Sequence, residues 1–127
     1  MSAPKRRVVA LVDDLMVRSR IEASATPETE LIFPRDAADF NEKLRPPPDL
    51  ILVGMAATRL PWPELVRDAR AKSSTRQVPI LAFGPHRDLE LRGRALEAGV
   101  DRVLANSALM VSLPGLLRGE ASTAQEE

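Results

Sequence analysis

The sequence predicts an α/β domain in which a five-stranded parallel sheet carries helices on both faces. Short apolar runs indicate the strands, and a segment with helical periodicity follows each of them after a short loop. Such alternation is typical of parallel sheets with right-handed crossovers, and five units of this size favour the doubly wound strand order 2-1-3-4-5. The predicted strands are Val8–Val12, Glu30–Phe33, Leu50–Val53, Val78–Phe83 and Arg102–Ala105.

The first two helices are marked by aspartates at their starts and prolines at their ends. Asp14 and Asp36 are placed to accept hydrogen bonds from the first free backbone N–H groups of each helix. Thr26-Pro27 ends the first helix, and Pro46–Pro48 ends the second. Apolar side chains at helical spacing are expected to cover the sheet: Val17, Ile21, Ala25, Ala37, Phe40 and Leu44.

Proline, aspartate and glycine delimit the next two helices. Pro61–Pro63 is expected to open the third helix, since proline in a first turn loses no intrahelical hydrogen bond. Asp88 can cap a fourth helix over Leu89–Ala98, and Gly99 is placed to end it. The side chains predicted to face inward from these helices are Leu65, Val66, Ala69, Leu91, Ala95, Leu96 and Ala98. Trp62 and Phe40 are expected in the core rather than on a binding surface.

Composition restricts the classes of function. The 127 residues contain 18 basic and 18 acidic side chains, and this balance gives no support to nucleic-acid binding. Because there are no cysteines, disulfides and thiolate metal sites are excluded. The sequence has no apolar stretch long enough for a membrane span and no evident signal peptide, so we expect a cytoplasmic protein. Residues 1–118 are expected to form one domain, and the small polar residues 119–127 a disordered tail.

The rim formed by the carboxyl ends of the strands is where we expect a functional site, because parallel α/β sheets gather ligand groups there. Asp13 and Asp14 follow the first strand, Gly54 the third, Gly84 the fourth and Asn106 the fifth. Two adjacent carboxylates suit a hard divalent cation such as Mg²⁺. The two glycines leave space at the same rim, so a cavity is expected there.

Four stretches of the chain resemble the receiver domain of bacterial response regulators, the CheY-like family. They are Val12–Asp14, Pro48–Val53, Val78–Phe83 and Ala95–Leu104, and the resemblance covers about residues 5–118. It implies a flavodoxin-like fold and a role in two-component, phosphorelay signal transduction. It also implies a rim with an acid pair for Mg²⁺, a phosphoacceptor aspartate, a hydroxyl, a lysine and an aromatic residue on the fifth strand.

Only the acid pair of that rim, Asp13 and Asp14, is present in this chain. Phosphoryl transfer needs a nucleophile and fixed positive charge or donors. The other matched positions hold Gly54 for the phosphoacceptor, Gly84 for the hydroxyl, Asn106 for the lysine, Ser107 for the proline that follows it and Val103 for the aromatic residue. The resemblance therefore implies a degenerate pseudo-receiver that is not an enzyme, needs no cofactor and acts by phosphorylation-independent protein–protein interaction.

A sensor of a small ligand or a divalent metal is the alternative hypothesis. Asp13 and Asp14 could hold Mg²⁺ together with a backbone carbonyl after Gly54, or they could serve only as a helix cap and a solvated acid. His86, the only histidine, follows the fourth strand and could accept a phosphoryl group, bind a metal with Asp14 or titrate near neutral pH, or it could be an exposed loop residue beside a helix start.

Basic side chains offer a second form of the sensor hypothesis. Arg18, Arg87 and Arg102 are expected near the same rim, where Asn106 and Ser107 would add neutral donors. Together they could form a pocket for a small anion or nucleotide. The arginines could equally pair with surface carboxylates.

The last helix is the candidate surface for a protein partner or a second copy of the chain. Ala108–Arg118 is unusually apolar and is expected to be helical with an interruption at Pro114-Gly115. Receivers usually signal through their fourth helix, fifth strand and fifth helix. The corresponding candidate interaction face here is Val103, Leu109, Met110 and Leu113. These side chains could instead all belong to the core.

Overall fold

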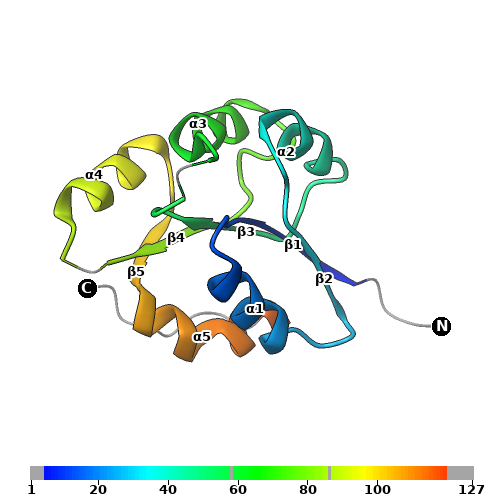
Figure 1. The fold of residues 1–127 in the computed structure, drawn as a ribbon. Coiled ribbons are helices and arrows are strands. Elements are labelled where there is room, and N and C mark those ends of the chain that lie inside the picture. The colour runs from blue at the N-terminus through cyan, green and yellow to red at the C-terminus, as the bar shows by residue number, and fades with distance from the viewer. Residues whose placement is uncertain (1–4, 58, 86, 120–127) are drawn as a thin grey trace.

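A computed structural model describes residues 5–57, 59–85 and 87–119 and shows one five-stranded sheet (Figure 1). The strands lie in the order β2-β1-β3-β4-β5 and all pair in parallel, which confirms the predicted doubly wound order. They differ from the predicted strands by at most two residues at either end. Their bounds are β1 Arg6–Leu11, β2 Thr29–Ile32, β3 Leu50–Gly54, β4 Ile80–Gly84 and β5 Arg102–Ala105.

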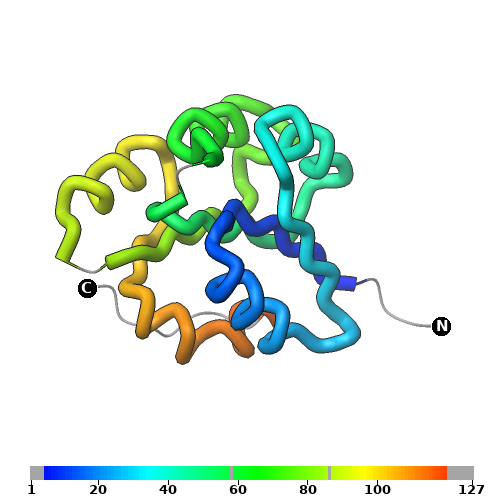
Figure 2. Tube along the Cα trace, in the orientation of Figure 1, coloured from blue at the N-terminus to red at the C-terminus, as the bar shows by residue number. Residues whose placement is uncertain are grey.

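Helices cover both faces of the sheet. They are α1 Leu15–Ser24, α2 Ala37–Lys43, α3 Trp62–Ala71, α4 Leu89–Ala98 and α5 Asn106–Arg118. α1 and α5 lie on one face and α2, α3 and α4 on the other, and the tube view shows α1 beside α5 (Figures 1 and 2). Asp14, Asp36 and Asp88 each accept a backbone N–H of the helix that follows, which confirms the three predicted caps.

Successive residues of the central strands face opposite layers of the core. In β3, Ile51 and Val53 pack with the residues under α2, α3 and α4, whereas Leu52 packs with those under α1 and α5. Phe40 and Trp62 are buried in the first of these layers, as predicted. Burial on both faces explains why the central strands are continuous apolar runs instead of alternating ones.

The predicted interruption at Pro114 is wrong, because α5 continues through this residue. A proline inside a helix costs about 3 kcal/mol through a lost hydrogen bond and ring crowding. Each fully buried leucine contributes about 1.5–3 kcal/mol, so together they outweigh that cost. The leucines of α5 that are buried are Leu109, Leu113, Leu116 and Leu117, while Pro114 is exposed.

The prediction that Leu96 faces inward is also wrong. Its side chain is 45% exposed, because α4 turns Ala95 and Ala98 toward the sheet and Leu96 lies on a different face of the helix. Leu89, at the start of the same helix, is 75% exposed. Within residues 5–57, 59–85 and 87–119, none of the helices is long and apolar enough to cross a membrane.

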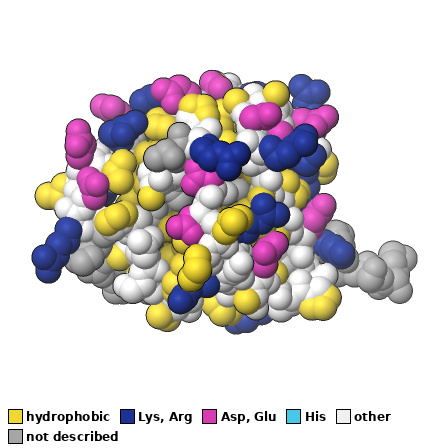
Figure 3. All heavy atoms as spheres, in the orientation of Figure 1, with side chains coloured by type: hydrophobic (Ala, Val, Ile, Leu, Met, Phe, Trp, Pro, Cys, Tyr) yellow, Lys and Arg dark blue, Asp and Glu magenta, His cyan; other side chains and the backbone are white. Residues whose placement is uncertain are grey.

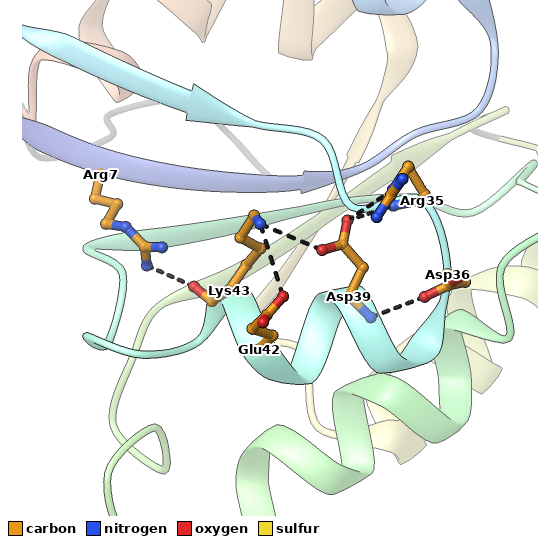
Figure 4. A network of polar contacts seen from close by, with 6 residues as sticks. All are labelled: Arg7, Arg35, Asp36, Asp39, Glu42 and Lys43. Atoms are coloured by element: carbon orange, nitrogen blue, oxygen red, sulfur yellow. Dashed lines mark hydrogen bonds and ion pairs between the residues drawn. The ribbon is translucent and has the colours of Figure 1, made fainter.

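A polar network at the start of α2 surrounds one buried carboxylate, Asp39 (Figure 4). Its Oδ2 accepts the backbone N–H of Arg35 at 3.0 Å, and its Oδ1 lies 3.3 Å from Lys43 Nζ. The hydrogen bond from the Arg35 backbone is the largest influence on the carboxyl and lowers its pKa. Burial opposes this effect, and the charges of Lys43 and Arg35 add to the lowering of the pKa.

A lowered pKa makes the contribution of Asp39 to stability depend on pH. The contribution is complete above the pKa of the unfolded chain and is lost as pH falls through the lower pKa of the folded state. We therefore expect the free-energy gap between the wild type and Asp39→Asn to shrink below about pH 4. Urea unfolding between about pH 7 and pH 3 measures that gap, with Asp68→Asn on the exposed side of α3 as the control. A constant gap for Asp39→Asn over this range would contradict the assignment.

Candidate functional site

The carboxyl ends of β1, β3 and β4 and the start of α5 enclose a hollow of about 290 Å³. Five residues predicted for the rim line it: Asp13, Asp14, Gly54, Gly84 and Asn106. The rest of its lining is apolar and comes from Val12, Val17, Ala56, Ala57 and Phe83.

Strand register brings these residues together. Val53 pairs with Leu11, which places Gly54 beside the end of β1 and ahead of Asp13. Gly54 pairs with Phe83, and Gly84 pairs with Ala105, the residue before Asn106. The rim residues therefore meet because parallel strands end at the same edge of the sheet.

Both carboxylates of the acid pair accept hydrogen bonds from the backbone. Asp14 Oδ1 accepts the N–H groups of Met16 at 2.8 Å and Val17 at 3.2 Å. Asp13 Oδ2 accepts the N–H of Arg59 at 2.9 Å, which ties the loop after β3 to the end of β1. Among the described residues, no group of three or more histidines, cysteines or carboxylates is placed to hold a metal ion. A cation at this rim would therefore share oxygens that already act in a helix cap and a loop contact.

Apolar side chains crowd the two glycines of the rim. A Cβ atom placed on Gly54 would lie 3.3 Å from Phe83 Cζ and 3.4 Å from the Leu11 carbonyl oxygen. A Cβ atom on Gly84 would lie 2.9 Å from Met55 Cε. Phe83 and Met55 are themselves buried, with 3% of each residue exposed. The space beside each glycine is thus bounded by a core side chain.

The remaining predicted rim residues do not all reach this hollow. Asn106 is exposed at the first position of α5 and lines the hollow, whereas Ser107 is exposed but is not part of the lining. His86 lies outside the described residues, as does the predicted tail beyond Gly119. Within the parts of the chain that the structure describes, the polar side chains at the hollow are therefore two carboxylates and one amide.

The candidate interaction face needs correction. Val103 is 4% exposed, Leu109 0% and Leu113 1%, so these three side chains belong to the core and cannot meet a partner. They are buried because β5 is sandwiched between the helical layers and α5 turns its leucines onto the sheet. Met110 is half-buried, and α5 presents Val111, which is 83% exposed, and Pro114 outward.

The expected position of Arg102 is also wrong. Arg102 is the first residue of β5 and lines a different hollow with Arg6, at the amino ends of the strands. Arg18, in contrast, does lie close to the rim and lines a second hollow of about 140 Å³ that shares Asp13 with the first.

Two further arginines at this second hollow, Arg35 and Arg59, were not predicted from the sequence. Both follow a strand, Arg35 shortly after β2 and Arg59 in the loop after β3. Position after a strand was therefore a usable signal. The sequence does not show that the loops carrying Arg35 and Arg59 lie side by side. That arrangement depends on long-range contacts such as the hydrogen bond from the Arg59 N–H to Asp13.

Comparison with known proteins identifies the architecture. No protein-family model matches this sequence, and no curated protein matches it either. A response regulator from Hahella chejuensis matches with a TM-score of 0.78 and 14% identity over 97% of this chain and 100% of that chain. The phosphorylated cyanobacterial phytochrome response regulator RcpA matches with a TM-score of 0.76 and 16% identity over 96% and 98% of the two chains.

A third match carries a metal in its own site. The receiver domain of a sensor histidine kinase from Pseudomonas aeruginosa PAO1, solved with a magnesium ion coordinated in the active-site cleft, gives a TM-score of 0.71 and 19% identity over 90% of this chain and 95% of that chain. Sequence identities of 14–19% together with TM-scores of 0.71–0.78 establish that the chain shares the fold of these proteins. The chain has the CheY-like, flavodoxin-like fold of response-regulator receiver domains.

Proposed function

We propose that this chain, which has the receiver fold, acts in signal transduction by binding a protein partner without being phosphorylated at the usual receiver position. The observation that carries the proposal is the environment of Gly54. The residue at the end of β3 has no nucleophile, and the ring of Phe83 bounds the space into which a side chain would extend.

The rest of the rim supports the same conclusion. No acidic residue occurs between Val53 and Pro63, so a shift of register supplies no other acceptor. Asn106 is neutral and offers no fixed charge to a phosphoryl group, and Gly84 offers no hydroxyl. The Asn106 amide at the hollow is a neutral donor, and a neutral donor gives a phosphoryl group less of the electrostatic stabilisation that transfer requires than a fixed positive charge would. The function that fits is contact with a partner rather than catalysis.

Incubation with acetyl phosphate and Mg²⁺ tests the proposal directly. We expect the intact mass of the wild type to stay unchanged, because the rim lacks a nucleophile at Gly54. Gly54→Asp alone is expected to label poorly, since Asn106 and Gly84 still lack a charge and a hydroxyl. The triple variant Gly54→Asp, Gly84→Thr, Asn106→Lys measures how far the missing groups restore labelling when the two crowded glycines are replaced together. A stoichiometric phosphoryl adduct on the wild type would overturn the proposal.

A small-ligand or metal sensor is the second candidate, and the hollow of about 290 Å³ favours it. Asp13, Asp14 and Asn106 supply polar groups at its edge, and Mg²⁺ is the metal that oxygen ligands of this kind would hold. The backbone hydrogen bonds already made by both carboxylates weigh against metal binding, because a cation would compete for the same oxygens. Because a ligand that binds only the folded state raises the melting temperature, thermal unfolding with and without Mg²⁺, Mn²⁺, nucleotides and small anions separates the two candidates.

A further inference from the structure

We propose that the hollow lined by Arg18, Arg35 and Arg59 binds an acidic, partly apolar segment of a protein partner. This inference rests on the proposed function and specifies the chemistry of the partner. The three arginines come from α1, from the residues after β2 and from the loop after β3, and they line a single hollow of about 140 Å³.

The charged side chains that line this hollow are mainly basic, although the chain as a whole has no net charge. The whole chain has 18 basic and 18 acidic side chains, but the lining of the hollow contains three arginines and one carboxylate, Asp13. Charges of one sign that converge at a concave surface raise the local concentration of the opposite charge. An anionic group is therefore the complementary ligand.

Arg18 is positioned by an aromatic ring, whereas the side chain of Arg35 is 85% exposed and lies near one carboxylate. Arg18 lies over the ring of Phe33, with Cζ 4.4 Å from the ring centroid. Its Nε is 3.7 Å from Glu22, and Arg35 Nε is 3.6 Å from Asp39, and both distances are longer than a hydrogen bond. A guanidinium carries five N–H donors, so each of these groups can also donate hydrogen bonds to the oxygens of an incoming carboxylate.

The loop that carries Arg59 is fixed independently. The backbone N–H of Arg59 donates to Asp13 Oδ2 at 2.9 Å, which holds this loop against the end of β1. Leu60, the next residue, is buried and also lines the hollow. The third arginine is therefore attached to an anchored segment of backbone, which lowers the cost of ordering it on binding.

Apolar side chains beside the arginines favour a protein segment over a free anion. Leu15 lines the hollow and is 75% exposed, and Met16 is 71% exposed in the same first turn of α1. Figure 3 shows apolar, basic and acidic side chains interspersed on the face of the molecule that it draws. Exposed apolar groups next to convergent arginines match a segment that carries both acidic and apolar residues.

Peptide binding measured by fluorescence anisotropy tests the inference. The probe is a labelled 14-residue peptide with Glu and Leu at helical spacing, and the matched peptide carries Gln in place of every Glu. We expect the Glu peptide to bind the wild type and the combined variant Arg18→Gln, Arg35→Gln, Arg59→Gln to bind it about tenfold more weakly, the size expected for three partly exposed ion pairs. The control variant Arg20→Gln, Arg67→Gln, Arg76→Gln removes the same charge from exposed positions outside the hollow and should change affinity less than about twofold.

Several results would overturn the inference. These are no binding of the Glu peptide to the wild type, equal binding of the Gln peptide, or an equal loss in the two triple variants. If inorganic phosphate displaces the peptide and the combined variant Leu15→Ser, Met16→Ser binds it normally, the site takes a small anion and not a protein segment. Peptide binding and the intact mass after acetyl phosphate treatment are separate measurements. Loss of peptide binding with an unchanged mass would refute this inference alone, whereas a phosphoryl adduct would refute the proposed function.

Discussion

Phe83→Ala is expected to lower the free energy of unfolding by about 3–5 kcal/mol, the usual cost of truncating a buried phenylalanine. Only 3% of Phe83 is exposed, and it packs with the core residues under α1 and α5. Its ring also lines the rim hollow and lies against Gly54. Urea unfolding followed by circular dichroism measures the loss. A loss below about 1 kcal/mol would show that the ring is not packed as described.

The same variant reveals whether Phe83 restricts the residue at position 54. Gly54→Asp alone should destabilise the chain by about 1–3 kcal/mol, because the added Cβ lies 3.3 Å from the ring and must displace it. With Phe83→Ala in the background this cost should fall, giving a coupling energy of about 0.5–3 kcal/mol. Phe40→Ala is the matched control, since Phe40 is equally buried but packs on the other face of the sheet. Additive effects in the Phe83 cycle would contradict the steric interpretation.

Arg70→Ala is expected to cost about 2–4 kcal/mol, because several hydrogen bonds from one charged group are lost together. Arg70 Nε donates to the Gly99 carbonyl at 2.7 Å, and Nη1 donates to the carbonyls of Arg76 at 2.7 Å and Val78 at 2.8 Å. Nη2 donates to Asp101 Oδ2 at 2.6 Å. One side chain thus links α3, the segment before β4, the end of α4 and the start of β5.

Two further variants separate the hydrogen bonds of Arg70 from the effect of its positive charge. Arg70→Lys keeps the charge but has no planar fork, so it should recover less than half of the lost stability. Arg67→Ala, on the exposed side of the same helix, should change stability by less than about 0.5 kcal/mol. Chemical denaturation of all three variants measures these differences. Full recovery by lysine would show that the charge, rather than the multiple hydrogen bonds, stabilises this corner of the fold.

Much of the fold follows from local patterns. The apolar runs that predicted Leu50–Val53 and Val78–Phe83 became central strands, because both layers of helices bury them. Asp36 and Asp88 cap their helices as expected, since an N-cap depends on residues only two or three positions away. The expectation for Pro114 failed because the local preference of proline was outweighed by leucines packed on a sheet formed from distant residues.

By itself the sequence determined the strand order, the helix caps and the residue types at the rim, which include Gly54 and Asn106. The tertiary structure alone decided what surrounds those positions. Phe83 lies against Gly54, and Arg35 and Arg59 come together with Arg18. The physical reason is that strand register and loop path set the direction of each side chain, and both arise from contacts between residues far apart in the chain.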